Sequence, residues 1–184
     1  MSKITVKELE APTGFDLKIA SGETLDLNSQ GTVILPTIPS NKMPTGSVLQ
    51  VVQQVHHSFT QINNSSSYVD TGLTKSITPS SSSSKILVVF SIQLGTNQTG
   101  GQNLQARLLA DSTVIRMLDN IHNSNGAALE AQASFQYLHS PSTTSAVTYK
   151  LQMKGTSSAH FRINNYNSSA NEACSTMTLM EIAG

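Results

Sequence analysis

Charged side chains are scarce in this sequence. Only 12% of the 184 residues are Asp, Glu, Lys or Arg, against about 25% in ordinary soluble domains. The formal net charge is zero, and Lys and Arg form no run. Proteins that bind nucleic acid need a basic patch to neutralise phosphates. The composition therefore predicts that nucleic acid is not a partner.

Cysteine and long apolar segments are equally rare. The single cysteine, Cys174, excludes an intrachain disulfide. Because it adjoins an apolar strand, we expect a small buried side chain rather than a nucleophile. No apolar run approaches the roughly 20 residues that span a bilayer, and residues 1–6 lack the apolar core of a secretory signal. We expect no membrane insertion, and synthesis and assembly in a cytosol.

The sequence also lacks the patterns of common catalytic and metal sites, such as a Gly-x-Ser-x-Gly elbow or a Cys-x-x-Cys pair. On a strand, His56 and His57 point to opposite faces. One strand therefore cannot supply both to a metal, although a threefold axis can gather one histidine from each chain. We predict no enzyme activity, no cofactor and no metal. The remote alternative is a polysaccharide-degrading enzyme with two carboxylates brought together by folding.

In place of charge the chain has Ser, Thr, Asn and Gln, which compete with the backbone for hydrogen bonds and disfavour helices. From residue 48 onward, apolar segments with a period of two alternate with polar turns. These segments are residues 48–55, 68–78, 85–94, 104–109, 113–118, 129–139, 147–153, 160–166 and 176–182. Their spacing predicts an all-β head over 48–184, an antiparallel β-sandwich of jelly-roll type.

Several of these strands carry a clear burial pattern. Residues 86–90 are apolar at every position, which predicts burial on both faces. Alternation points Leu104, Ala106 and Leu108 inward, and a tight turn follows at 110–112. Residues 127–134 are rich in helix formers, so a helix is the alternative there, but the alternation continues through Tyr137. The last strand is apolar enough to lie in the middle of a sheet.

Residues 15–35 repeat in units of eight, with apolar pairs at the same phase in each unit. These pairs are Leu17 and Ile19, Leu25 and Leu27, and Val33 and Leu35. Each unit predicts a short strand with one apolar face, too short to be stable alone. Identical stripes from three chains around an axis would bury that face. We therefore predict a homotrimeric β stalk over 1–35 and a proline-rich linker over 36–47. A loose N-terminal extension is the alternative.

The connections between head strands are long and polar, at 56–67, 95–103, 119–127 and 155–172. They contain the Asn and aromatic side chains that recognise sugars or adaptable protein surfaces. The candidate surface-binding residues are Phe59, Asn63, Asn97, Asn123, His160 and Tyr166. The alternative is that these loops are merely solvated.

Several passages together form a pattern that covers most of the chain. They are residues 2–9, 19–27, 44–52, 68–73, 77–80, 84–88, 107–115 and 178–184. In this pattern the chain resembles the short fibre-like structural proteins of tailed marine bacteriophages, in particular those that infect cyanobacteria. The resemblance implies a virion protein and a homotrimer, docked by its N-terminus on another virion protein. It also implies a head that binds a host-surface glycan or protein, as in a tail fibre. A capsid decoration protein with a stabilising role is the alternative.

Overall fold

The computed structural model describes residues 38–63, 67–96, 101–125, 130–155, 160–164 and 173–184. The whole predicted stalk, with Leu17, Ile19, Leu25, Leu27, Val33 and Leu35, lies outside the described residues, as do Asn97 and Tyr166. The described part is built from strands, preceded by a single turn of 3-10 helix at Ser40–Lys42.

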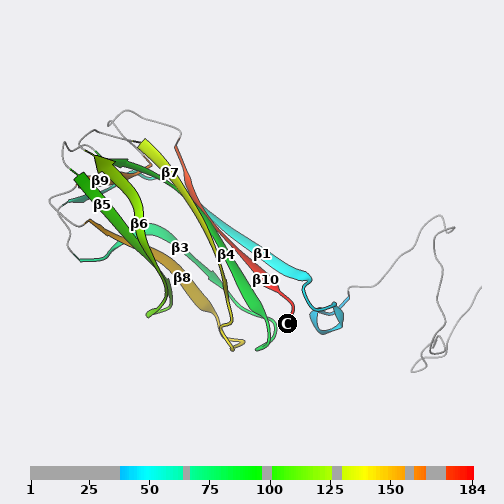
Figure 1. Cartoon of the computed structure of the whole chain (residues 1–184). Coiled ribbons are helices and arrows are strands. Elements are labelled where there is room, and N and C mark those ends of the chain that lie inside the picture. The colour runs from blue at the N-terminus through cyan, green and yellow to red at the C-terminus, as the bar shows by residue number, and fades with distance from the viewer. Residues whose placement is uncertain (1–37, 64–66, 97–100, 126–129, 156–159, 165–172) are drawn as a thin grey trace, which may run out of the picture. The chain divides into compact units, whose positions relative to one another are not determined.

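The strands follow one another along the chain with short connections (Figure 1). Their bounds are β1 Val48–His56, β2 Thr60–Asn63, β3 Val69–Ile77, β4 Lys85–Thr96, β5 Gly101–Ala110, β6 Thr113–Asn125, β7 Glu130–His139, β8 Val147–Gly155, β9 His160–Ile163 and β10 Ser175–Ile182. Every ladder between them is antiparallel. The helical alternative for 127–134 is therefore wrong from Glu130 onward, because β7 pairs along β4 over its whole length.

One sheet is organised around the long strand β4. Strand β7 lies along one edge of β4, and β10 followed by β9 lies along the other. Strand β1 pairs with β10 and β2 pairs with β9. The pairs β1/β2 and β9/β10 thus each act as one interrupted strand. With these pairs counted as single strands, the order is β1/β2, β9/β10, β4, β7.

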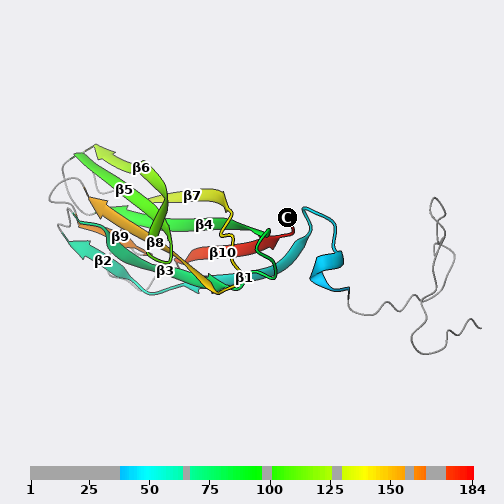
Figure 2. The same cartoon turned by 90° about the horizontal axis from the view of Figure 1, so that it is seen from below.

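The second sheet has the order β3-β8-β5-β6. Two four-stranded sheets in this order form the jelly roll, a sandwich of two Greek keys. Figure 2 shows the two sheets from below. The predicted antiparallel β-sandwich is confirmed, and β10 lies inside its sheet as expected, between β1 and β4.

The core is made by the alternate residues that point between the sheets. The inward residues of β5, Leu104, Ala106 and Leu108, are completely buried, as their spacing predicts. Strand β4 differs from its prediction. Ile86 and Val88 are completely buried, but Leu87 on the other face is only half-buried. The described residues therefore cover only one face of β4.

Three smaller expectations are wrong. Part of the predicted loop 56–67 is strand β2, and β6 continues through the predicted loop 120–126 as far as Asn125. Both segments are polar, and both form strands because a neighbouring strand offers them a ladder in register. Cys174 is exposed rather than buried, because it precedes β10 and the inward position belongs to Ser175.

Strand β3 is interrupted at Gly72, which has a φ of 87°. Backbone in this region strongly favours glycine. Thr71 stabilises the irregularity from inside, because its hydroxyl donates to the Leu151 carbonyl at 2.8 Å. From β1, the Gln54 amide donates to the Gly72 carbonyl at 3.0 Å and accepts from the Thr74 N–H at 2.6 Å. The bulge in β3 thus fits against the edge of the other sheet.

We expect Gly72→Ala to destabilise the head by about 2–4 kcal/mol, from left-handed strain plus overpacking. A Cβ there would lie 2.6 Å from His56 Cε1. Gly46 is the matched control, because its φ is 89° and a Cβ added to it would have nothing within 4 Å. Urea unfolding of Gly72→Ala and Gly46→Ala separates the two contributions. Equal losses in the two variants would contradict the contact with His56.

The strands divide the connections between two ends of the sandwich. At the proximal end, residues 38–47 enter β1, β10 leads to the last residues, and β3 leads to β4. There the Gly46 N–H donates to the Ala183 carbonyl at 2.8 Å, and the Ala183 N–H donates to the Ser47 carbonyl at 2.8 Å. At the opposite, distal end, β2, β4, β6 and β8 finish and β3, β5, β7 and β9 begin (Figure 1).

Candidate functional site

The distal end contains the strand ends on which most of the predicted binding residues lie. Asn63 ends β2 and His160 begins β9, and the two are partners in the antiparallel ladder. Asn123 lies near the end of β6, where it pairs with Asn103. The structure thus brings together, at the level of the backbone, residues that are almost 100 positions apart in the chain.

Phe59 lies in the short break between β1 and β2 and is 48% exposed. The Arg162 guanidinium from β9 lies 5.8 Å from the centre of its ring. The Arg162 Nε also donates to Gln61 Oε1 at 3.2 Å. An exposed ring beside a guanidinium offers a flat apolar surface edged by hydrogen-bond donors. Such a surface suits contact with a sugar ring or a protein side chain.

Asn164 holds this break in place, and no pattern in the sequence singled it out. It is buried and has a φ of 67°. Its Nδ2 donates to the His56 carbonyl at 2.7 Å and to the Ser58 carbonyl at 3.0 Å. Its Oδ1 accepts from the Ser175 hydroxyl at 2.6 Å. One amide therefore ties the interrupted strand β1/β2 to the interrupted strand β9/β10, next to Phe59.

A second aromatic group lies on the outer face of the other sheet. The Arg107 guanidinium lies 4.2 Å from the centre of the Tyr68 ring, and Lys154 Nζ lies 4.9 Å from it. Burial raises the pKa of Tyr68, and the nearby Arg107 charge opposes that rise. The Tyr68 hydroxyl is buried, and no described residue offers it a hydrogen-bond partner. Residues from β5 and β8 meet Tyr68 only through folding, so sequence reasoning did not find this cluster.

Around Tyr68 the cations Arg107 and Lys154 contact the ring, and the Asp119 carboxylate lies near enough to raise the pKa of the hydroxyl. Arg107 Nε donates to Gln152 Oε1 at 2.8 Å, and Gln152 Nε2 donates to Asp70 Oδ1 at 2.6 Å. Asp70 also pairs with Lys150, with 3.5 Å between Oδ2 and Nζ. Two cations against one ring form a surface suited to anionic or hydroxyl-rich groups.

At the proximal end, a carboxylate is completely buried. Glu181 Oε1 accepts from the Ser80 N–H at 2.6 Å, from the Ser80 hydroxyl at 2.7 Å and from the Ser84 hydroxyl at 2.7 Å. Glu181 Oε2 accepts from Gln50 Nε2 at 2.6 Å. Burial raises the pKa of Glu181, but these hydrogen bonds outweigh it and hold the pKa below its ordinary value. Glu181 thus anchors the serine-rich connection between β3 and β4.

A cavity of about 230 Å³ adjoins this connection, and its lining includes Ser80, Ser81, Ser83 and Ser84. A second cavity, of about 240 Å³, lies beside His139. His139 Nδ1 and the Tyr149 hydroxyl are 2.8 Å apart. Burial lowers the pKa of His139 and raises that of Tyr149.

Metal-ligating groups are dispersed in the described part of the chain. Among its residues, no three His, Cys, Asp or Glu side chains come close enough together to hold a metal ion. Within the same ranges, no helix is long and apolar enough to cross a membrane.

No protein-family model and no curated protein matches the sequence. Solved structures of infectious bursal disease virus share part of the strand arrangement. The Gx strain structure aligns at 12% identity and a TM-score of 0.41, over 81% of this chain and 43% of that chain. The Gt strain structure aligns at 13% identity and a TM-score of 0.42, over 82% of this chain and 43% of that chain. The VP2 subviral particle aligns at 13% identity and a TM-score of 0.39, over 82% of this chain and 42% of that chain. This chain spans less than half of theirs, and similarity at this level does not define a function.

Proposed function

We propose that this chain is a structural protein of a virus particle. In this proposal it forms a homotrimeric fibre or spike whose N-terminal segment docks on another virion protein. The head binds the host surface through its distal end, and the protein catalyses no reaction. The observation that carries the proposal is the two-ended layout of the jelly roll. Residues 38–47 enter at the proximal end, whereas the predicted binding residues that the structure describes lie toward the opposite end.

The layout supports display because it separates attachment from recognition. Glu181 and the main-chain bonds of Gly46 and Ser47 stiffen the end by which the head is held. Phe59 with Arg162, and Tyr68 with Arg107 and Lys154, supply aromatic and cationic groups away from that end. A jelly roll also suits this role, because viral capsid and lectin domains use the same fold.

We expect the purified full-length chain to bind cells that the parent virus infects and to compete with virus adsorption. Phe59→Ala removes the exposed ring, so it should weaken binding at least about threefold, the smaller end of what one interface aromatic contributes. Met117→Ala is the control, because Met117 is equally exposed on the other sheet. Cell binding is measured by flow cytometry with labelled protein.

No binding by the unmodified chain, and no competition, would overturn the host-binding part of the proposal. A reconstruction of the particle then decides the location, since density on the capsid shell would favour a decoration protein over a tail fibre. Incubation with host polysaccharide is the test of the non-enzymatic part. New reducing ends would contradict it.

A further inference from the structure

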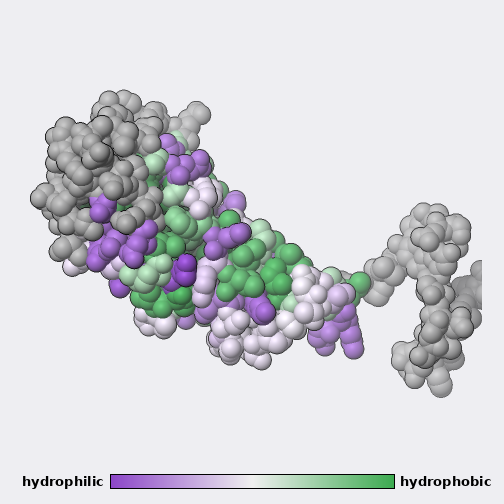
Figure 3. Space-filling model, in the orientation of Figure 1, coloured by the Kyte–Doolittle hydropathy of each residue, from purple (hydrophilic) through white to green (hydrophobic). Residues whose placement is uncertain are grey.

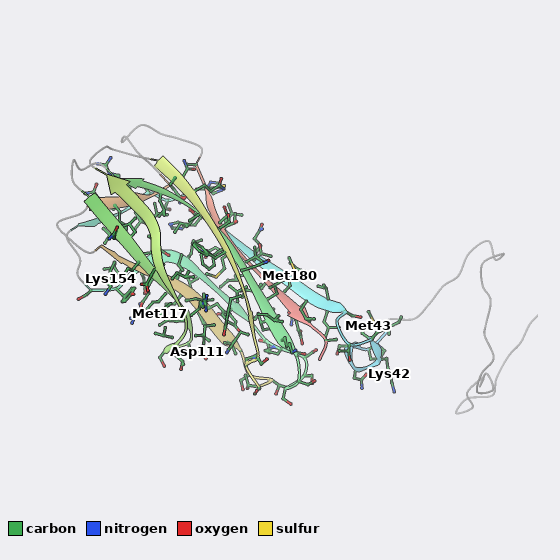
Figure 4. The ribbon with its side chains drawn as sticks, in the orientation of Figure 1. Lys42, Met43, Asp111, Met117, Lys154 and Met180 are labelled. Carbon is green, nitrogen blue, oxygen red and sulfur yellow. The ribbon has the colours of Figure 1, made fainter. Side chains whose placement is uncertain are left out.

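We infer that the outer face of the sheet formed by β1, β10, β4 and β7 is the contact surface between copies of this chain. The inference rests on the homotrimer of the proposed function and goes beyond it, because it assigns the head its own subunit interface. Figure 4 shows Met180 on this side of the sandwich and Met117 and Lys154 on the opposite side.

One row of apolar residues crosses the whole face. The strand register places Val51 opposite Met180, Met180 opposite Leu87, and Leu87 opposite Leu138. Residues opposite one another in a ladder point to the same face, with side chains in contact range. Val51 is 55% exposed and Leu138 is 49% exposed. Each of the four strands thus contributes one outward apolar side chain to a continuous row.

The neighbouring outward positions extend the row into a patch. Val48 and Ile182 lie opposite one another on the proximal side, and on the distal side Val89 shares its row with the polar residues Gln53, Thr178 and Gln136. Monomeric proteins seldom expose contiguous apolar patches of more than a few hundred Å² unless the patch has a partner. Figure 3 shows apolar side chains at the surface of the half of the sandwich nearer residues 38–47. The sequence predicts that β4 is buried on both faces, and a partner on this patch would cover the second face.

The two outer faces differ in charge. Among the outward residues described from Lys85 to Ser91 on β4, and among their ladder partners, Lys85 alone is charged. The opposite outer face carries Asp70, Arg107, Lys150 and Lys154. A solvated surface keeps its charges, whereas the centre of an interface is depleted of them. The sandwich therefore has one face suited to water and one suited to a protein neighbour.

A second copy is the occupant that fits best. Close to a threefold axis the same residues of each chain meet, so a charged patch there would repel itself, whereas an apolar patch can pack against its own copies. This patch is free of such charges except at its margin. It also begins at β1, the strand that directly follows residues 38–47. The N-terminal trimer of the proposed function would hold three copies of this chain at a high local concentration, so a second copy is within reach of the patch.

The test compares two residues with equal exposure on the two outer faces. Leu138 and Met117 are both 49% exposed, and they lie on β7 and β6, which are edge strands of their sheets. We expect Leu138→Glu to raise the trimer–monomer midpoint concentration at least about tenfold, because it places an unpaired charge in the apolar contact made by each subunit. Met117→Glu should leave the midpoint unchanged. Analytical ultracentrifugation of the full chain over a concentration series measures both.

Val51→Thr tests the same row with a change of almost no volume, so folding is preserved. It should raise the midpoint about threefold or more, since it places three hydroxyls in an apolar contact. Far-UV circular dichroism confirms the fold of each variant. If the unmodified chain is a trimer and neither Leu138→Glu nor Val51→Thr weakens it, this inference is overturned while the proposed trimer stands. A monomeric unmodified chain would overturn the trimer itself.

Discussion

Glu181→Ala is expected to lower the free energy of unfolding by about 3–5 kcal/mol. The substitution leaves four donors facing an empty site, namely the Ser80 N–H, two serine hydroxyls and Gln50 Nε2. Each buried donor without a partner costs about 1–3 kcal/mol, and water entering from the adjoining cavity offsets part of the sum. Urea unfolding followed by circular dichroism measures the loss.

Glu181→Gln removes the negative charge of the side chain while keeping its shape. The glutamine keeps one acceptor for the serines but turns an NH₂ group toward Gln50, whose own amide also donates to the Thr78 carbonyl at 2.7 Å. We expect a loss of about 1–3 kcal/mol, the range for hydrogen bonds to a charged group. Asp119→Asn is the control, because that carboxylate is exposed. A Glu181→Ala variant as stable as Asp119→Asn would contradict the anchoring role.

The stabilisation that the Glu181 hydrogen bonds contribute decreases at low pH. The pKa of Glu181 is lower in the folded chain than its ordinary value of 4.5. Its ionised form therefore stabilises the fold fully above that value, and the contribution disappears as the pH falls through the folded pKa. The stability gap between the unmodified chain and Glu181→Gln should be constant from pH 7 to about pH 5 and should shrink below it.

The fold was predictable because its signal is local. Strand β8, and β5 as far as Leu108, alternate between inward apolar and outward polar residues, and period-two patterns of this kind are unambiguous. The strands that were missed, β2 and the second half of β6, are polar. Their pairing partners hold them as strands, and a pattern read along one segment contains no information about a partner.

The functional residues were harder to predict for the same reason. Phe59 stood out as an aromatic ring in a polar stretch, so sequence alone could select it. Glu181 lies in an apolar strand and belongs to no sequence motif, since its donors come from residues about 100 and 130 positions earlier in the chain. Tyr68 likewise meets Arg107 and Lys154 only after three segments have been brought together by folding.

Asn164→Ala is expected to be nearly as damaging as Glu181→Ala, at about 3–4 kcal/mol. The loss has two sources. The first is the amide itself, since the His56 and Ser58 carbonyls and the Ser175 hydroxyl lose their buried partner. The second is the backbone, because a φ of 67° is tolerated by asparagine far better than by alanine.

Asn164→Gly distinguishes the two sources, because glycine removes the hydrogen bonds without left-handed strain. It should be about 1 kcal/mol more stable than Asn164→Ala, with the remaining loss due to the amide. Asn41→Ala, in the exposed single turn at Ser40–Lys42, is the control and should change little. Chemical denaturation gives the free energies. A cost below that of one ordinary hydrogen bond, about 1 kcal/mol, would show that Asn164 is not the tie between the two interrupted strands.

The loss of Asn164 should also be visible locally. Its amide holds the main chain of His56 and Ser58 against β10, immediately before Phe59 and β2. Amide hydrogen exchange in Thr60–Asn63 should therefore accelerate in Asn164→Ala more than exchange in β8, which pairs on both sides with β3 and β5. Because Phe59 lies in the segment that loosens, the variant should also lose cell binding while its proximal end, anchored independently by Glu181, keeps its protection.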